Sequence, residues 1–371
     1  MKILIVGGGI TGLSAAWFAK KRYPDAHITL LEKESRLGGW IRTARTEGFC
    51  FEVGPRTFPF GRCPNLLSLI EELKLPILVS ASLKKYIYTD GKLRSFGSFL
   101  PKLLPYLIRE AFIPASTQDD QTIYEFAARR FSPDIAETLF DPLTLGIYGG
   151  DIRKLSLKCC FPSLYHMEKQ HRSLIRDLFS SPKSKKGLFT IKGGMQTLID
   201  ALEKHLNIEI VLNCNVDQIG DHQVIAQDAV WRADRVIAAL PPPLPARSLW
   251  VVNLAFAGDI LPKKGFGYLI PTKEKEALLG VVFDSHIFPE QNRGDVTCLS
   301  AMVRPEESEP IQAALQALQR HLHIQQTPIY TASFLARNAI PQFELGCTYP
   351  YGVSVDACIA RGKCLLGNEN V

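Results

Sequence analysis

The sequence lacks the features that mark several large classes of protein. It has no run of about 18 uncharged apolar residues, so no membrane-spanning helix is expected. It has no long basic tract with interleaved aromatic residues, and its net charge of +6 over 371 residues is mild, so we expect no nucleic-acid partner. Internal repeats and low-complexity segments are also absent. The 46% hydrophobic and 22% charged residues are ordinary for a globular chain of two or three domains.

Metal-binding and disulfide patterns are missing as well. Of the nine cysteines none forms a CxxC pair; Cys159 and Cys160 are adjacent, and the others lack zinc-ligand spacing. An odd number of cysteines without a secretory signal suits a reducing compartment. His166 and His171 are poorly placed to share a helix face, so no metal site is expected.

The most informative motif of the sequence lies at its N-terminus. Residues 1–6 form a short apolar run, residues 7–16 read GGGITGLSAA, and residues 28–32 read ITLLE. This order predicts a strand, a glycine turn, a helix and a second strand that ends in an acid, which is the βαβ unit of dinucleotide-binding proteins. The apolar run is too short for a signal peptide.

Each residue of this motif has a physical role. Gly7 allows the tight turn, Gly9 lets a pyrophosphate approach the backbone, and Gly12 lets the helix pack close to the strand. The phosphates would lie at the helix N-terminus, where free N–H groups and the helix dipole favour an anion. Glu32 is placed to accept hydrogen bonds from ribose hydroxyls, and its charge disfavours NADP.

A second pair of motifs narrows the nucleotide. Residues 37–43 read LGGWIRT and residues 51–57 read FEVGPRT. A glycine pair and an arginine lie within a dozen residues of Glu32, the predicted ribose-binding acid. This arrangement suits the doubly charged pyrophosphate of FAD better than a nicotinamide cofactor, which dissociates after reaction. The alternative interpretation is a surface turn followed by a hairpin.

With these motifs the chain resembles the protoporphyrinogen oxidases, within the wider amine-oxidase-like flavoprotein group. The N-terminal motifs indicate the flavoprotein group, and the middle segments point to the oxidases. The segments that carry the resemblance are residues 34–43, 52–56, 155–164, 171–173, 252–254, 265–267, 280–285, 288–291 and 339–343. The resemblance implies an α/β fold with an FAD-binding Rossmann-like domain, a mixed-sheet substrate domain and a helical insert.

The domains expected from this resemblance alternate along the chain. Residues 1–60, 183–248 and 336–371 are assigned to the FAD-binding domain, the last part shortened, and residues 61–94 and 249–335 to the substrate domain. Residues 95–182 form the helical insert.

The resemblance also implies which residues form the site. The expected cofactor contacts are Gly7, Gly8, Gly9, Ile10, Thr11, Gly12, Glu32, Lys33, Gly38, Gly39, Trp40, Arg42, Gly54, Pro55, Arg56, Thr57, Val216, Val353, Ser354 and Val355. Arg56, Phe266, Gly267 and Met302 are expected to bind the substrate. A guanidinium can pair with a propionate, which makes Arg56 the best candidate; the alternative is a contact with the cofactor or a surface salt bridge. No catalytic side chain is expected, because the flavin accepts the hydride equivalents.

The function implied is the FAD-dependent, six-electron oxidation of protoporphyrinogen IX to protoporphyrin IX in heme biosynthesis, with molecular oxygen as acceptor. Two alternatives stay open: another flavin oxidase or desaturase of the same group, and a non-catalytic binding protein on the same scaffold. The expected location is the cytoplasm, with peripheral association with the inner face of the cell membrane left open. A homodimer is also left open, as is coproporphyrinogen as substrate.

One segment resembles the family's membrane-binding region. Residues 95–114 are rich in Leu, Phe and Ile, with basic residues interspersed and prolines that interrupt any long helix. They could lie in a bilayer interface, or they could pack as helices in a soluble core.

The C-terminal part departs from the family pattern. Residues 340–342 (IPQ) are followed after only nine residues by residues 352–359, GVSVDACI, which match the segment that covers the flavin in the family. One interpretation is an internal deletion that leaves this cover in place. The other takes residues 365–368 as a strand end, so that the chain stops before the cover.

Periodicity predicts several local elements. We expect helices over residues 64–75, 122–131, 134–143, 193–202 and 309–322, a hairpin over 85–93 with its turn at Asp90 and Gly91, and a loop over 183–187. Thr122 and Glu125 have the spacing of a capping box.

Overall fold

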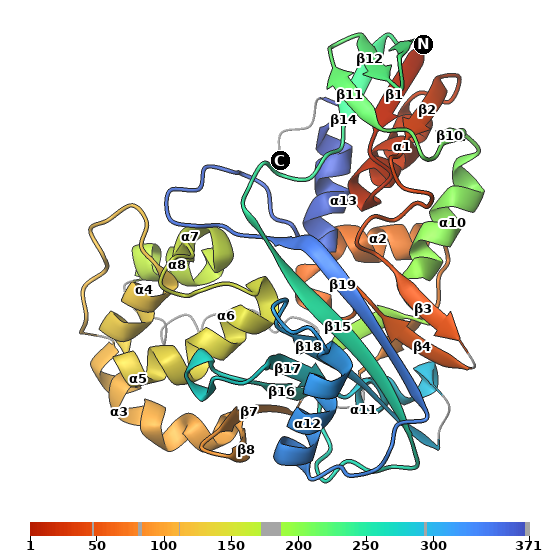
Figure 1. The fold of residues 1–371 in the computed structure, drawn as a ribbon. Helices are drawn as coiled ribbons and strands as arrows, with labels where there is room; N and C mark the ends of the chain where they lie inside the picture. The colour runs from red at the N-terminus through yellow and green to blue at the C-terminus, as the bar shows by residue number, and fades with distance from the viewer. Residues whose placement is uncertain (47, 81–83, 111, 172–186, 293–294, 368–371) are drawn as a thin grey trace. The chain divides into compact units, whose positions relative to one another are not determined.

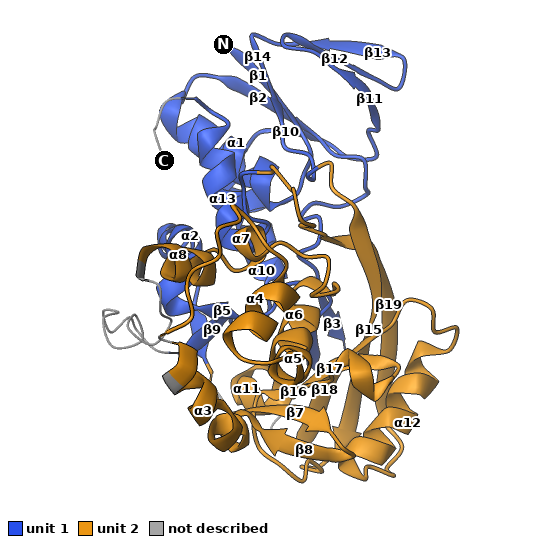
Figure 2. Cartoon of the chain, turned by 90° about the vertical axis from the view of Figure 1, so that its left-hand side faces the viewer, with its two compact units in different colours: residues 1–79, 184–242, 350–371 blue, residues 80–183, 243–349 orange. Residues whose placement is uncertain are grey.

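The protein divides into two compact units, each built from separated stretches of the chain. The computed structural model describes residues 1–371 except 47, 81–83, 111, 172–186, 293–294 and 368–371 (Figure 1). Unit 1 comprises residues 1–79, 184–242 and 350–371, and unit 2 comprises residues 80–183 and 243–349 (Figure 2).

Unit 1 is organised around a four-stranded parallel sheet with the order β10-β2-β1-β14. Its elements are β1 (Lys2–Val6), α1 (Ile10–Arg22), β2 (His27–Leu31), β3 (Thr43–Thr46), β4 (Phe49–Glu52), β5 (Phe58–Pro59), α2 (Pro64–Glu72), β6 (Ile77–Val79), β9 (Leu188–Ile191), α10 (Gln196–Leu206), β10 (Glu209–Val211), β11 (Val216–Ile219), β12 (Gln223–Ala226), β13 (Ala229–Arg232), β14 (Arg235–Ala238) and α13 (Val355–Cys364).

Both faces of this sheet are covered, because successive residues of its strands pack into two different cores. Ile3 and Ile5 of β1 belong to a core that includes residues of α1, α2, α10 and α13, whereas Leu4 and Val6 pack with Val224 and other residues of the small sheet β11-β12-β13. Successive side chains of a strand point to opposite faces, and parallel sheets are covered on both. The layers are therefore helices, parallel sheet and antiparallel sheet.

Unit 2 contains a seven-stranded sheet with the order β19-β15-β18-β17-β16-β7-β8. Its strands β7 and β16 pair in parallel, and the other neighbours pair antiparallel. Its elements are β7 (Lys85–Thr89), β8 (Lys92–Ser95), α3 (Leu100–Glu110), α4 (Ile123–Arg130), α5 (Pro133–Ile135), α6 (Asp141–Tyr148), α7 (Leu157–Cys160), α8 (Pro162–His171), β15 (Ala246–Ala257), β16 (Gly267–Leu269), β17 (Leu278–Val282), α11 (Asp284–Ile287), β18 (Val296–Val303), α12 (Pro310–Leu322) and β19 (Tyr330–Pro341).

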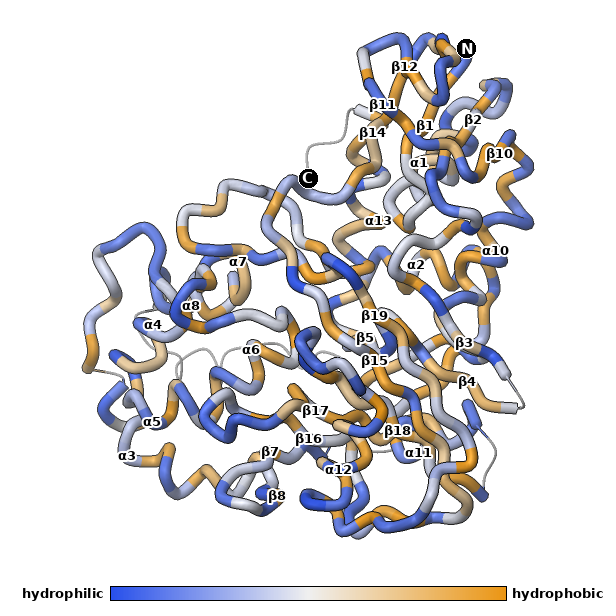
Figure 3. Tube along the Cα trace, viewed as in Figure 1, coloured by the Kyte–Doolittle hydropathy of each residue, from blue (hydrophilic) through white to orange (hydrophobic). Residues whose placement is uncertain are grey.

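The core of unit 2 lies between this sheet and α12. Val252, Leu254 and Phe256 of β15 pack with Ala314 and Leu318 of α12. The strand β15 is drawn mostly in the hydrophobic colours of Figure 3, which fits its place between β19 and β18 in the sheet. Met302 and Val251 point to the opposite face, where they form a second cluster.

A buried network of charges ties the helices of unit 2 together. The Arg130 guanidinium of α4 contacts Glu110 Oε1 of α3 at 2.6 Å and Glu168 Oε1 of α8 at 2.8 Å, and all three side chains are fully buried. Arg129 and Gln121 also bond to Glu168. Buried charges occur in proteins when they are paired in this way.

Local predictions agree with the structure where a local signal exists. The turn between β7 and β8 has positive φ at Asp90 and Gly91, and Thr122 and Glu125 form the capping box of α4. The helix predicted over 64–75 ends at Glu72, because Lys74 has φ of +53°.

Three other helices differ from their predicted bounds. The helix predicted over 193–202 begins only at Gln196, after two glycines with positive φ, and the one predicted over 309–322 begins at Pro310. The single helix predicted over 134–143 is instead α5, a five-residue π-helical turn and α6. The loop predicted over 183–187 lies outside the described residues except for Gly187.

The units also differ from the domains predicted from the sequence. Residues 61–79 lie in unit 1, because α2 packs against α13 and β6 pairs with β9. Residues 336–349 lie in unit 2, because β19 continues along β15 to Pro341. Residues 243–248 also join unit 2 at the start of β15, and the helices of residues 95–171 cluster with the sheet of unit 2 rather than as a separate body.

Candidate functional site

The glycine turn after β1 has the geometry of a phosphate loop. Gly7 has φ of +107°, and a side chain on Gly12 would lie 1.9 Å from the Gly7 carbonyl oxygen, so helix and turn touch backbone to backbone. A side chain on Gly9 would meet nothing within 4 Å. Gly9 is the N-cap of α1, and Ile10 and Thr11 begin the helix. Open space therefore lies beside the first N–H groups of α1, where an anion is favoured.

Glu32 follows β2 and lies beside this turn. Its Oε2 accepts a hydrogen bond from the Gly8 N–H at 2.5 Å and its Oε1 accepts one from the Glu34 N–H at 2.8 Å, and the residue is only 8% exposed. The carboxylate is thus fixed by two backbone donors while lone pairs remain for ribose hydroxyls. Lys33 is exposed and points its ammonium to Glu34 at 3.9 Å.

The second glycine pair is bonded directly to the first turn. The Gly38 N–H donates to the Gly8 carbonyl at 2.8 Å, and Gly38 and Gly39 have φ of +103° and +57°. The Arg36 guanidinium donates to the carbonyl oxygens of Gly39 at 2.5 Å and Leu37 at 2.9 Å. Burial, with the nearby Arg42 charge, lowers the pKa of Arg36. Sequence reasoning missed this positioning role, although Arg36 stands two residues before the pair.

Residues 52–57 link this site to α10. Glu52 accepts hydrogen bonds from the Met195 N–H at 2.6 Å and from Thr43 Oγ1 at 2.9 Å, which anchors the β3–β4 hairpin at the N-terminus of α10. A side chain on Gly54 would lie 1.9 Å from the Trp40 carbonyl oxygen, so only glycine fits at this position. Pro55, Arg56 and Thr57 are half-buried, and Arg56 donates to the Glu52 carbonyl at 3.1 Å.

The remaining predicted cofactor residues lie on α13 and β11. Ser354 is the N-cap of α13, flanked by Val353 and the buried Val355. A side chain on Gly362 would lie 2.6 Å from the Thr11 carbonyl oxygen. The segment predicted to cover the flavin therefore leads into a helix that packs on α1, and residues 365–367 are not a strand.

The helices α1 and α13 run parallel. Cys358 bonds to Thr11, and Arg22 of α1 donates to the Gly367 carbonyl beyond α13, so both N-termini lie at one end. Val216 begins β11 close after Cys214, whose N–H donates to the Glu32 carbonyl at 2.9 Å. All predicted cofactor residues thus belong to unit 1.

The predicted substrate residues are divided between the units. Arg56 belongs to unit 1, whereas Phe266, Gly267 and Met302 belong to unit 2. Gly267 begins β16 with φ of +139°, and a side chain there would lie 2.1 Å from the Val281 carbonyl oxygen, so strand packing alone requires glycine. Met302 lies on β18 in register with Gly280 of β17.

Lys85, which the sequence did not single out, lies beside the predicted substrate residues Phe266 and Gly267. It pairs with Gly267 in the parallel β7–β16 register, and its Nζ lies 5.3 Å from the centre of the Phe266 ring. No carboxylate lies within ion-pair distance of it among the described residues. Partial burial lowers the pKa of its ammonium. Lys85 is the exposed first residue of a strand whose other residues are buried, and nothing in its local sequence marks it as a site residue.

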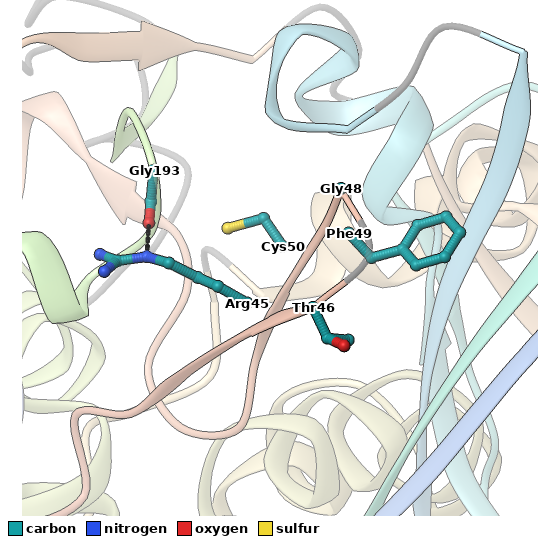
Figure 4. Close-up of a pocket in the computed structure, with 6 residues that line it drawn as sticks. All are labelled: Arg45, Thr46, Gly48, Phe49, Cys50 and Gly193. Carbon is teal, nitrogen blue, oxygen red and sulfur yellow. Dashed lines mark hydrogen bonds between the residues drawn. The ribbon is translucent and has the colours of Figure 1, made fainter.

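A pocket of about 410 Å³ lies at the β3–β4 hairpin of unit 1. It is lined by Arg45, Thr46, Gly48, Phe49, Cys50 and Gly193 (Figure 4). Arg45 bonds to the Gly193 carbonyl at 2.9 Å and to Thr197 at 2.8 Å. These lining residues include none of the predicted site residues, and the pocket is not assigned to the site.

The fold and the glycine turns define the class of this protein. The chain belongs to the flavin containing amine oxidoreductase family, whose pattern matches residues 10–254. Among its relatives, the protoporphyrinogen oxidase of Bos taurus is 30% identical over 463 residues, covering 97% of this chain and 96% of that protein. The coproporphyrinogen III oxidase of Bacillus subtilis is 27% identical over 457 residues, covering 99% and 97%.

Solved structures show the same fold. A structure from Exiguobacterium sp. 255-15, provisionally assigned as a protoporphyrinogen oxidase, aligns with a TM-score of 0.84 at 23% identity, covering 98% of this chain and 97% of that one. Putrescine oxidase aligns with a TM-score of 0.69 at 18% identity, covering 98% of each. These likenesses confirm the predicted α/β fold class.

The cofactor is FAD, and the residues of unit 1 fit it. The open space at Gly9 and the N-terminus of α1 suit the pyrophosphate, and the fixed Glu32 carboxylate suits the ribose.

Proposed function

We propose that this protein oxidises protoporphyrinogen IX to protoporphyrin IX with FAD, in heme biosynthesis. The observation that carries the proposal is that an intact dinucleotide turn with Glu32 occurs in a chain matched over 97% of its length by a protoporphyrinogen oxidase. FAD, when bound, takes two electrons at a time, so the six-electron oxidation needs three cycles. Molecular oxygen is the proposed acceptor.

The protein's own residues bind and orient the substrate. In unit 2, Lys85 offers a cation to a propionate carboxylate, and the Phe266 ring offers an apolar face to the macrocycle. Arg56 of unit 1 stays a predicted contact of a propionate or of the cofactor. Met302 adds a polarisable thioether. We assign no side chain the role of proton donor or acceptor.

An anaerobic titration tests this function. The protein is loaded with FAD, freed of unbound flavin and mixed with protoporphyrinogen, while the visible spectrum is followed. Bleaching of bound flavin with growth of the porphyrin band supports the proposal, and admission of oxygen should restore the oxidised flavin. Flavin that stays oxidised would point to another substrate, and failure to retain flavin would point to a non-catalytic scaffold.

Coproporphyrinogen III is the second candidate substrate. The ammonium groups of Lys84 and Lys263 lie 5.7 and 5.6 Å from the centre of the Tyr86 ring. Tyr86 follows Lys85 on β7. A cluster of cations suits a substrate with four carboxylates rather than two. A ratio of kcat/KM values for the two porphyrinogens decides between them.

We further propose that α3 attaches the protein to an anionic membrane surface from the cytoplasm. Its inner face packs into unit 2 through Leu103, Tyr106 and Leu107, while Leu100 and Leu104 are each 56% exposed. Pro105 lies inside this helix, which is only 11 residues long. Among the described residues no helix is both long and apolar enough to cross a bilayer.

Sedimentation with vesicles tests the attachment. Wild-type protein should sediment with vesicles that contain anionic lipid, and a Leu100→Ser/Leu104→Ser variant should stay in the supernatant. Equal sedimentation of both would rule out α3 as the anchor.

A further inference from the structure

Two cysteines that are far apart in the sequence lie side by side in unit 2. Cys159 is in the last turn of α7, and Cys347 is in the segment that follows β19. The Cys159 Sγ lies 3.6 Å from the Cys347 carbonyl oxygen, across a sequence separation of 188 residues.

The backbone holds these two segments together. The Ser156 N–H donates to the Phe343 carbonyl at 2.8 Å, and the Leu345 N–H donates to the Lys154 carbonyl at 2.9 Å. The two bonds run in opposite directions between the segments, as in a short antiparallel pair. The proximity of the thiols is therefore built into the fold of unit 2.

The environment distinguishes this pair from its neighbour Cys160. Cys159 and Cys347 are half-buried, whereas Cys160 is buried and its pKa is raised to about 12, chiefly by burial. Burial also raises the pKa of Cys159, and the Cys347 thiol adds to this rise. Since only a thiolate reacts with peroxide, Cys159 is slow to take the first step.

We propose that Cys159 and Cys347 are a redox-sensitive pair that a hydroperoxide converts into an intramolecular disulfide. The Cys347 thiol loses its proton, and the thiolate attacks one oxygen of hydrogen peroxide. The O–O bond breaks, the released hydroxide takes up the proton to leave as water, and a sulfenic acid remains on Cys347. Cys159 sulfur then attacks the sulfenic sulfur, the S–O bond breaks, and its thiol proton leaves with the hydroxyl as a second water. Two thiols are oxidised by two electrons and one peroxide is reduced, whatever the substrate of the flavin site.

The crosslink would fasten the segment after β19 to α7. This segment leads, eight residues after Cys347, to Val355 at the start of α13, so the disulfide would restrain the approach to the predicted flavin cover. Disulfides in a reducing compartment are usually reversible and redox-sensing. The link would also close a long loop of the unfolded chain and so raise the unfolding temperature.

Peptide mapping of the FAD-loaded full chain tests this pair. The reduced protein is treated with hydrogen peroxide, its remaining thiols are alkylated, and a non-reducing digest is analysed by mass spectrometry. We expect one crosslinked peptide pair containing Cys159 and Cys347, which reduction separates. The pair should be absent from Cys347→Ser and Cys159→Ser and retained by Cys160→Ser, the matched control.

Two results would overturn the proposal. One is a disulfide between Cys159 and Cys160, and the other is over-oxidation of Cys347 while Cys159 remains free for alkylation. Thermal unfolding gives an independent readout: the oxidised wild type should melt several degrees above its reduced form, and oxidised Cys347→Ala should not. Equal melting of oxidised and reduced wild type would contradict a closed 188-residue link.

Discussion

At the scale of single residues, Glu32 holds two backbone N–H groups with its two carboxylate oxygens. Glu32→Gln replaces one acceptor with an NH₂ donor and removes the charge that ribose hydroxyls would meet. We expect FAD to bind about 10- to 100-fold more weakly, as the loss of a charged hydrogen bond implies. Quenching of flavin fluorescence measures this, and Glu34→Gln at an exposed position serves as the control. Unchanged affinity would exclude Glu32 from the ribose site.

We expect Lys85 to contribute to the binding of the substrate and not to that of the cofactor. Lys85→Met keeps the stem against Phe266 but removes the cation. We expect KM for protoporphyrinogen to rise about tenfold with kcat and FAD affinity little changed, because one charged contact is lost. Lys92→Met, at an exposed position of β8 outside this group, is the matched control. A fall in kcat alone would argue against a carboxylate contact.

The residues that could be predicted are those whose role is set by near neighbours. Gly7, Gly12 and the Thr122 capping box follow from spacings of a few residues, and Glu32 follows from the βαβ pattern. Lys85 could not be found in this way, because only the parallel pairing of β7 with β16 brings it beside Gly267, 182 positions away. Long-range pairing leaves no mark in a local window.

At the scale of secondary structure, α13 depends on one close contact with α1. A methyl group on Gly362 would lie 2.6 Å from the Thr11 carbonyl oxygen and 2.9 Å from the Ala15 nitrogen, and both are backbone atoms. Gly362→Ala should destabilise unit 1 by about 1–3 kcal/mol and weaken FAD binding, because the helices must move apart. Urea denaturation and flavin fluorescence measure the two effects. Gly97→Ala, whose added carbon meets nothing within 4 Å, should leave both unchanged.

The α3, α4 and α8 helices are joined by the Arg130 network. Arg130→Met would leave Glu110 and Glu168 buried without their main cation, which costs about 3–5 kcal/mol of folding free energy. Chemical denaturation followed by circular dichroism measures this loss. Arg153→Met, which removes an exposed pair with Glu137, should cost less than about 1 kcal/mol. Similar losses for both variants would contradict the special role of the buried network.

At the scale of the whole molecule, the chain passes between the two units several times, and this explains which boundaries the sequence could not reveal. Asp356 of α13 accepts a hydrogen bond from the Leu66 N–H of α2 at 2.9 Å, across 290 residues. That contact draws residues 61–79 into unit 1, although nothing in their composition separates them from the following hairpin. Unit 1 is built from three segments that such long-range contacts hold together, so its boundaries cannot be predicted from local composition.

The stability of unit 2 should fall as the solution becomes acidic. His321, stacked 3.8 Å from the Tyr88 ring centre, is buried, and burial lowers its pKa more than Glu276 raises it. In the unfolded chain this imidazole titrates near 6.5, so below that pH the unfolded state binds a proton that the folded state does not. The pKa of Glu276 is lowered too: burial opposes the shift, but hydrogen bonds from Arg320 and His321 outweigh it. Its contribution is lost only below about 4.5.

The window between pH 7 and 5.5 therefore isolates His321, and the urea midpoint of the wild type should decrease across it. Trp250, the single tryptophan of unit 2, packs against the same core and reports its unfolding by fluorescence. His321→Phe keeps an aromatic ring beside Tyr88 but has no proton to bind, so its midpoint should vary less with pH, whereas the exposed His205→Gln should follow the wild type. A wild-type midpoint that is constant from pH 7 to 5.5 would mean that the imidazolium is accommodated, with the Glu276 carboxylate 3.2 Å away offsetting the cost of its burial.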